Sequence, residues 1–391
     1  MLEILNMSKA IENDIVNDRR IIHQNPEIGS NLQQTTKYVI HRLTEIGYSP
    51  KEICSCGVAA AIGKKGKTIL LRADMDALPM QEETCLPFRS QNNYAHTCGH
   101  DTHTAMLLGA ARLLKEHEAE LEGTVILMFQ PDEEGFTGAS SMIKAGILEN
   151  PKVDAAMAIH INSELYTAGC AAVHPGITMA SADKFKITVT GLGGHGAAPH
   201  VTVDPINVAC HINIALQELI SREIDPIEQA VLTIGSFHSG SAANVIPQDA
   251  VMEGTIRTFS KELREFIKKR LVEISSLTAE TFRAKCNVEF ISEVSALYNN
   301  EKLTSSMTEY IKEVVGEDNL LVAPQEMGSE DFALIAERVP STFALLGAGI
   351  ADEKCRYSEH NPKVVFDEKA LPIGSAIYAH CAIRWLKENR L

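Results

Sequence analysis

Two different spacings of hydrophobic residues run along this chain. In its first part, short apolar runs at 68–73, 124–129 and 155–159 are typical of strands buried on both faces of a parallel sheet. Segments with apolar residues at helical spacing, at about 104–117 and 139–145, lie between these runs. Strands that alternate with helices in this way predict an α/β domain.

The N-terminal segment is predicted to form two helices followed by a short strand. Ser8 can cap the first helix, whose apolar stripe includes Ile15, and the second helix covers about 34–46. Glycine readily adopts the left-handed conformation that ends many helices, so Gly47 marks the end of the second one. A strand is expected at 58–62.

The pattern changes at about residue 182. Apolar and polar residues alternate over 183–190, as in an antiparallel strand with one face exposed. The next predicted elements are helices at 205–221 and 261–283 and strands at 230–237, 250–259 and 287–291. This βαββαβ order predicts a ferredoxin-like α+β domain at 182–294. It is inserted into an α/β domain formed by 1–181 and 295–391.

Composition and charge narrow the possible partners. The 391 residues carry a net charge of −15 without any cluster of Lys and Arg, which argues against nucleic acid and anionic membranes as partners. The first residues do not resemble a signal peptide, and no apolar stretch is long enough to span a membrane. Nine scattered cysteines are unlike a disulfide framework. We therefore expect a cytoplasmic protein.

Residues that can bind metal ions gather in one stretch and at the ends of the predicted strands. A thiol and three imidazoles lie within residues 96–103, directly before a predicted helix. Asp76, Glu133, Glu134 and His160 each follow an apolar strand. Because α/β sheets place their sites at the carboxyl ends of strands, these side chains are expected to meet.

A hydrolytic metal site needs several protein ligands, an open position for water and a base. The candidate ligands are Cys98, His100, Glu134, His160 and His360. Five ligands are too many for one tetrahedral zinc ion with an open position, so they suit two adjacent ions. We assign Glu133 as the general base and Asp76 as the residue that orients a ligating imidazole. No Gly-x-Ser-x-Gly elbow and no P-loop competes with this site.

Each candidate also has a purely structural interpretation. His160 could be a core histidine, His360 a turn residue, and His195 part of a glycine-rich hairpin. Asp101 is expected to cap a helix and His103 to support a ligand from behind.

Six motifs in order along the chain resemble the M20 metallopeptidases, and most closely their amidohydrolase branch. That branch includes hippurate hydrolases, auxin-conjugate hydrolases and N-acetyl-diaminopimelate deacetylases. The motifs are Arg-Ala-Asp-Met-Asp-Ala-Leu-Pro at 72–79, Thr-Cys-Gly-His-Asp at 97–101, Gln-Pro-Asp-Glu-Glu at 130–134, Gly-Gly-His-Gly-Ala at 193–197, Asn-Val-Ile-Pro at 244–247 and His-Asn-Pro at 360–362.

The resemblance implies a mixed-sheet binuclear metallohydrolase domain, interrupted by a lid domain through which two subunits form a homodimer. It implies the same five ligands, Glu133 as the base, and two divalent ions, Mn²⁺ or Zn²⁺, with Co²⁺ or Ni²⁺ as alternatives. In the family, a histidine matching His195 reaches the oxyanion across the dimer, and Asn244 matches a substrate-binding asparagine. This chain has Asp74 where the wider family has a ligating histidine, and Asp132 where alanine is commoner in the branch.

We therefore predict that the protein hydrolyses the amide bond of N-acyl amino acids, which are small-molecule substrates. Metal-bound hydroxide attacks the acyl carbon and Glu133 transfers the proton. Two alternatives remain open at this point. One is an M20-type dipeptidase or carboxypeptidase with the same site, and the other is a catalytically silent metal or amino-acid binding protein.

Overall fold

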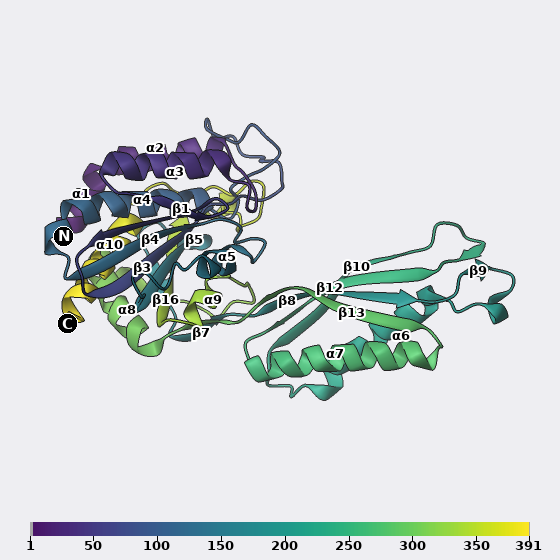
Figure 1. Cartoon of the computed structure of the whole chain (residues 1–391). Helices are drawn as coiled ribbons and strands as arrows, with labels where there is room; N and C mark the ends of the chain where they lie inside the picture. The colour runs from purple at the N-terminus through teal and green to yellow at the C-terminus, as the bar shows by residue number, and fades with distance from the viewer. Residues whose placement is uncertain (1–2, 391) are drawn as a thin grey trace. The chain divides into compact units, whose positions relative to one another are not determined.

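The computed structural model describes residues 3–390, which form two compact units. Within the described residues, the first unit consists of 3–178, 298–324 and 331–390, and the second of Met179–Leu297 and Gln325–Glu330. Figure 1 shows a sheet covered by helices in the first unit and a second sheet with helices on one face in the second. No helix within residues 3–390 is both long and apolar enough to cross a membrane.

An eight-stranded mixed sheet forms the centre of the first unit, in the order β1-β2-β4-β3-β5-β16-β6-β15. Its strands are β1 (Lys51–Cys54), β2 (Gly57–Gly63), β3 (Lys67–Asp74), β4 (Gly123–Gln130), β5 (Ala155–Thr167), β6 (Ala171–Val173), β15 (Leu320–Val322) and β16 (Ser341–Gly349). The four central strands β4, β3, β5 and β16 are parallel. Strands β1 and β2 extend the sheet in antiparallel fashion, and β6 is antiparallel to β16.

The helices of the first unit pack on this sheet because their apolar faces complete its core. They are α1 (Glu3–Ala10), α2 (Glu12–Gln24), α3 (Gln33–Ile46), α4 (His100–Glu116), α5 (Gly138–Lys144), α8 (Glu301–Val315), α9 (Ala333–Ala336) and α10 (Ala370–Glu388), with short 3₁₀ turns η1 (Glu118–Glu120), η4 (Glu317–Asn319) and η5 (Glu353–Cys355). Helices α4 and α10 lie in contact and are buried over most of their length. A side chain at Gly109 would place its Cβ 2.3 Å from Ser375 Oγ, so this close approach depends on glycine.

The second unit has a four-stranded antiparallel sheet in the order β10-β12-β8-β13, with two helices on it. Its elements are β8 (Ala182–Thr190), β9 (Gly194–His195), η2 (Pro199–Val201), α6 (Pro205–Glu218), the π-helical turn η3 (Leu219–Glu223), β10 (Ala230–Ser239), β11 (Val245–Ile246), β12 (Asp249–Thr258), α7 (Lys261–Thr281) and β13 (Lys285–Val294). Strands β7 (Gly176–Met179) and β14 (Leu297–Asn299) pair where the chain enters and leaves this unit. Phe185, Ile187 and Val189 are buried, as the alternation along β8 predicts.

The predicted α/β class with a large mixed sheet is confirmed, but three local predictions are wrong. Ser8 does not cap a helix, because it is buried inside α1 and its hydroxyl donates to the Pro372 carbonyl oxygen at 2.6 Å. Strand β5 does not end before His160 but continues to Thr167, because β16 pairs alongside it. Helix α4 begins at His100 rather than near Thr104, directly after Gly99 at φ +89°.

Candidate metal centre

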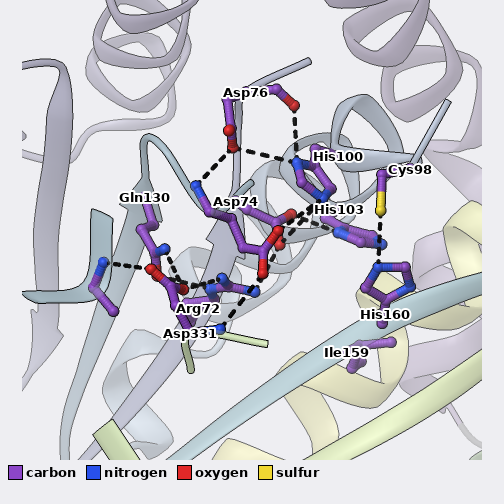
Figure 2. Close-up of polar contacts among 12 residues, drawn as sticks. Arg72, Asp74, Asp76, Cys98, His100, His103, Gln130, Ile159, His160 and Asp331 are labelled. Carbon is purple, nitrogen blue, oxygen red and sulfur yellow. Dashed lines mark hydrogen bonds and ion pairs between the residues drawn. The ribbon is translucent and has the colours of Figure 1, made fainter. Parts of the chain in front are cut away.

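The predicted site residues of the first unit meet near the carboxyl ends of the parallel strands. Figure 2 shows four of them, Asp76, Cys98, His100 and His160. Asp76 follows β3, and Glu133 and Glu134 follow β4. Cys98 lies just before α4, and His100 is the first residue of that helix. Segments far apart in sequence therefore bring their polar groups to one edge of the sheet, as expected for an α/β fold.

Two of the groups of possible ligand atoms in the described residues overlap at Cys98. Cys98 Sγ lies 3.5 Å from His160 Nε2 and 3.3 Å from His360 Nε2. His360 Nε2 is also 3.4 Å from Glu134 Oε1. In the group Cys98, His100 and His160, and in the group Cys98, Glu134 and His360, these atoms all lie within 4.8 Å of one another. Cys98 belongs to both groups, so its sulfur is placed to contact two ions.

The ring of His100 is oriented so that one nitrogen is left for a cation. Its Nδ1 lies 2.8 Å from the main-chain oxygen of Asp76 and donates a hydrogen bond to it. In the neutral ring the proton therefore sits on Nδ1, and Nε2 keeps its lone pair. This Nε2 is buried and forms no hydrogen bond with any of residues 3–390. A buried acceptor nitrogen without a donor fits a metal ion.

The electrostatic environment also favours a cation. Burial lowers the pKa of His100, but Asp74 and Asp76 outweigh it and raise this pKa to about 10. Burial, together with Glu134 and Glu133, raises the pKa of the Cys98 thiol well above its ordinary value. The same negative potential that holds a proton on an imidazole attracts a metal ion, and a bound ion would reverse the effect on the thiol.

The carboxylate of Asp76 fixes the loop that carries the two glutamates. Its oxygens accept hydrogen bonds from the main-chain N–H groups of Glu133 at 3.1 Å and Glu134 at 3.2 Å. One oxygen is also 3.3 Å from His100 Nδ1. Asp76 thus contacts the imidazole of His100 and also aligns the backbone of both glutamates with it.

Asp132 has a role that sequence reasoning missed. Its backbone has φ +52°, a conformation that aspartate tolerates better than most residues. The Thr137 hydroxyl donates to its carboxylate, and the Ser30 hydroxyl does so at 3.3 Å. Its carbonyl oxygen accepts from the N–H of Gly138 at 3.0 Å. Asp132 therefore shapes the turn that follows the glutamates.

A buried ionic network around Arg72 lies close to the site (Figure 2). The Arg72 guanidinium donates to Gln130 at 2.9 Å, to Asp74 at 2.6 Å and to Asp331 at 3.1 Å. The main-chain N–H of Asp331 lies 3.4 Å from a carboxylate oxygen of Glu133. Burial opposes ionisation of Asp74, but Arg72 holds its pKa well below the ordinary value. The Arg72 guanidinium therefore stabilises the negative charges of the buried Asp74 and Asp331 carboxylates.

His103 is excluded as a ligand by its hydrogen bonds, although it lies close to Asp74 and His100. Its Nδ1 is 2.5 Å from Asp74, and its Nε2 accepts the Ile161 N–H at 2.8 Å. Burial lowers its pKa to about 4, so the ring is neutral. Both ring nitrogens form hydrogen bonds, so neither is available to a metal ion. His103 instead packs behind the site, where it contacts Asp74.

Asp101 is not the helix cap that the sequence suggested, because Gly99 occupies that position. The Asp101 carboxylate instead accepts from Arg19 Nε at 2.9 Å and contacts His23 Nδ1 at 2.8 Å. His23 Nε2 in turn lies 3.1 Å from Glu82. His23, expected from the sequence to be an ordinary residue, therefore belongs to a buried network that anchors the start of α4.

His195 and Asn244 lie side by side in the second unit. His195 on β9 pairs with Val245 on β11, and the Gly196 N–H donates to the Asn244 carbonyl oxygen at 2.8 Å. Both residues are exposed, and His195 Nδ1 accepts the Ala197 N–H at 3.0 Å. This leaves His195 Nε2 directed away from its own turn.

Overlapping groups of possible cation ligands beside a carboxylate, at the carboxyl edge of an α/β sheet, are typical of metal-dependent hydrolases. The chain belongs to the Peptidase family M20/M25/M40, whose family model matches residues 70–384. The family membership predicted from the motifs is thereby confirmed.

Three curated relatives match nearly the whole chain. Thermostable carboxypeptidase 2 of Saccharolobus solfataricus is 37% identical, covering 98% of each chain. IAA-amino acid hydrolase ILR1-like 4 of Arabidopsis thaliana is 38% identical over 96% of this chain and 86% of its own. N-acetyl-L-cysteine deacetylase of Bacillus subtilis is 37% identical over 97% of this chain and 90% of its own.

A solved structure shares the fold. It is the Bacillus subtilis YXEP protein, described as a dinuclear metal binding peptidase from the M20 family, with a TM-score of 0.81 and 33% identity. The alignment covers 97% of this chain and 99% of that chain.

Replacing Arg72 with Met should strongly destabilise the protein. The change leaves two carboxylates buried without their counter-charge, and breaking a buried pair in this way costs about 3–5 kcal/mol. Arg20→Met is the matched control, because Arg20 pairs with Glu368 with 46% of its own side chain exposed and should contribute only about 0–1 kcal/mol. Denaturant unfolding of the two variants measures the difference, and similar losses would contradict the assignment.

Proposed function

We propose that this protein hydrolyses the amide bond of N-acyl amino acids with the help of two divalent metal ions. The observation that carries this proposal is the pair of ligand groups that share Cys98, with Glu133 beside them. The proposed ligands are Cys98, His100, Glu134, His160 and His360. Their mixture of thiolate, imidazole and carboxylate suits Zn²⁺ or Mn²⁺, with Co²⁺ and Ni²⁺ as further candidates.

Glu133 is the proposed general base. Bound divalent ions supply Lewis-acid activation and lower the pKa of water from 15.7 toward about 7. Glu133 Oε2 lies 4.0 Å from His100 Nε2, at the border of the ligand set, so it can take a proton from water there. It then passes this proton to the leaving amine. Asp76 and the N–H of Asp331 hold this carboxylate and its backbone in place.

The names of two relatives support an N-acylated amino acid as the substrate. N-acetyl-L-cysteine deacetylase and IAA-amino acid hydrolase are both named for the release of an amino acid from an acyl group. We propose the same bond here, without assigning the acyl group or the amino acid. The second candidate function is a carboxypeptidase with the same centre, which the similarity to thermostable carboxypeptidase 2 favours.

The second unit is proposed to complete the site in a homodimer. The exposed His195 would stabilise the oxyanion in the site of the partner subunit, and Asn244 would bind substrate. Strand β10 supports this arrangement, because it is an edge strand of the four-stranded sheet and its Val231 and Phe237 are partly exposed.

Glu133→Gln should abolish turnover but leave metal content unchanged. The amide keeps the size of the side chain but cannot accept the proton, and loss of a general base lowers kcat by about 10²–10⁴-fold. Steady-state rates and metal analysis of the same sample measure both effects. The exposed Glu149→Gln serves as the control and should behave like the parent protein. Joint loss of activity and metal in Glu133→Gln would remove the base assignment.

A substrate panel decides between the two candidate functions. Protein stripped with chelator and reloaded with Mn²⁺ or Zn²⁺ is offered N-acetyl amino acids, N-benzoyl amino acids and unblocked dipeptides, and amine release is measured. We expect cleavage to depend on metal and to be confined to the blocked substrates. Cleavage of unblocked dipeptides alone would favour the peptidase, and silence toward the whole panel would contradict both functions.

A further inference from the structure

His360 is a proposed ligand that no helix or strand holds. It lies in the irregular segment between η5 and α10, and 53% of its side chain is exposed. Its backbone adopts φ +64°, which residues other than glycine seldom do. The His360 N–H donates to the Thr97 carbonyl oxygen at 3.0 Å, which ties the backbone to the Cys98 segment. One such bond does not determine where the imidazole points, so other contacts must hold this loop.

An irregularity in β5 lies close to this loop. Strand β16 pairs with β5 at Gly347 opposite Asn162, but its next pair is Gly349 opposite Thr167. Residues 163–166 of β5 are therefore bulged out of the ladder. The Asn162 side chain accepts the Leu165 N–H at 2.8 Å and stabilises this bulge. A bulge frees main-chain N–H groups that a regular strand would use within the sheet.

The first freed group binds the residue before His360. The Ser163 N–H donates to a carboxylate oxygen of Glu359 at 2.8 Å. The Ser163 hydroxyl lies 3.2 Å from the same oxygen and 2.8 Å from the Tyr357 carbonyl oxygen, so its proton is shared between them. Ser163 is buried and Glu359 is partly buried, which shields these charge-assisted bonds from water.

We propose that Ser163 and Glu359 are positioning residues that hold His360 in the second ligand group, with Cys98 and Glu134. Ser163 is three residues after His160 on β5, and Glu359 directly precedes His360. The hydrogen bond between Ser163 and Glu359 therefore joins the segment that carries His160 to the segment that carries His360. It sets the distance between these ligands without touching an ion. This inference rests on the proposed metal centre. Removing a residue that hydrogen-bonds to a metal ligand typically lowers metal affinity by about 10- to 100-fold.

Glu359→Ala is the principal test, with Mn²⁺ as the probe. Full-length protein stripped with chelator is titrated with Mn²⁺, and free Mn²⁺ is measured by electron paramagnetic resonance. We expect one of two Mn²⁺ sites to weaken by about 10- to 100-fold while the other is unchanged. Two sites that keep their parent affinities would overturn the proposal.

Three further variants test whether Glu359 acts through its hydrogen bonds, which position His360, or through its negative charge. Glu359→Gln removes the charge but keeps an acceptor oxygen, so it should retain most of the affinity. Ser163→Ala removes the hydroxyl but keeps the N–H bond, and it should cause a smaller loss than Glu359→Ala. Glu353→Ala, an exposed acid on η5 with only a 3.8 Å contact to Arg356, is the control and should have no effect. Equal losses in Glu359→Gln and Glu359→Ala would show that charge, not position, matters.

A double variant shows whether the effect acts through His360. In protein that already carries His360→Ala, adding Glu359→Ala should change Mn²⁺ affinity no further. An additional loss of affinity in the double variant would assign Glu359 a different role and overturn the proposal.

A failure of this inference can be distinguished from a failure of the proposed function. Parent protein that binds none of Mn²⁺, Zn²⁺, Co²⁺ and Ni²⁺ would refute the metal centre itself, whereas parent protein with two sites and an unaffected Glu359→Ala would refute this inference alone.

Discussion

The concentration of negative charge at one edge of the central sheet is the constraint on which the site depends. Asp74, Asp76 and Glu133 are buried there, and Glu134 is partly buried, close to the imidazole of His100 and the thiol of Cys98. Buried carboxylates without counter-charges are costly, so the fold must supply cations. Arg72 supplies one from the sheet side, and the orphaned Nε2 of His100 marks where metal ions would supply the others.

Hydrogen bonds with main-chain groups orient several of the side chains in the site. The Asp76 carbonyl oxygen fixes the tautomer of His100, the N–H of Asp331 holds Glu133, and the N–H of Ser163 holds the loop of His360. Main-chain groups are tied to the sheet and its connections, so they position a ligand more rigidly than a flexible side chain can. This explains how His360, a proposed ligand on an irregular loop, can share a site with proposed ligands on a helix and a strand.

The sequence predicted the parts of this structure whose signal is local. Apolar runs predicted β3 and β4, and the density of Cys and His around Cys98 predicted a metal site. It could not predict the pairing of Arg72 with Asp331, which lie 259 positions apart, because only the folded sheet brings them together. Nor could it reveal the bulge beyond His160, which arises from the register of β5 against β16, or the turn that Asp132 shapes.

The most direct test of the central claim is crystallographic. The protein would be crystallised with Zn²⁺ and an anomalous difference map recorded at the zinc absorption edge. Two peaks should appear at the carboxyl edge of the sheet, each about 2.3 Å from Cys98 Sγ, the usual distance for a zinc–sulfur bond. A single peak, or peaks that leave Cys98 uncoordinated, would contradict a two-ion centre built on a shared thiolate.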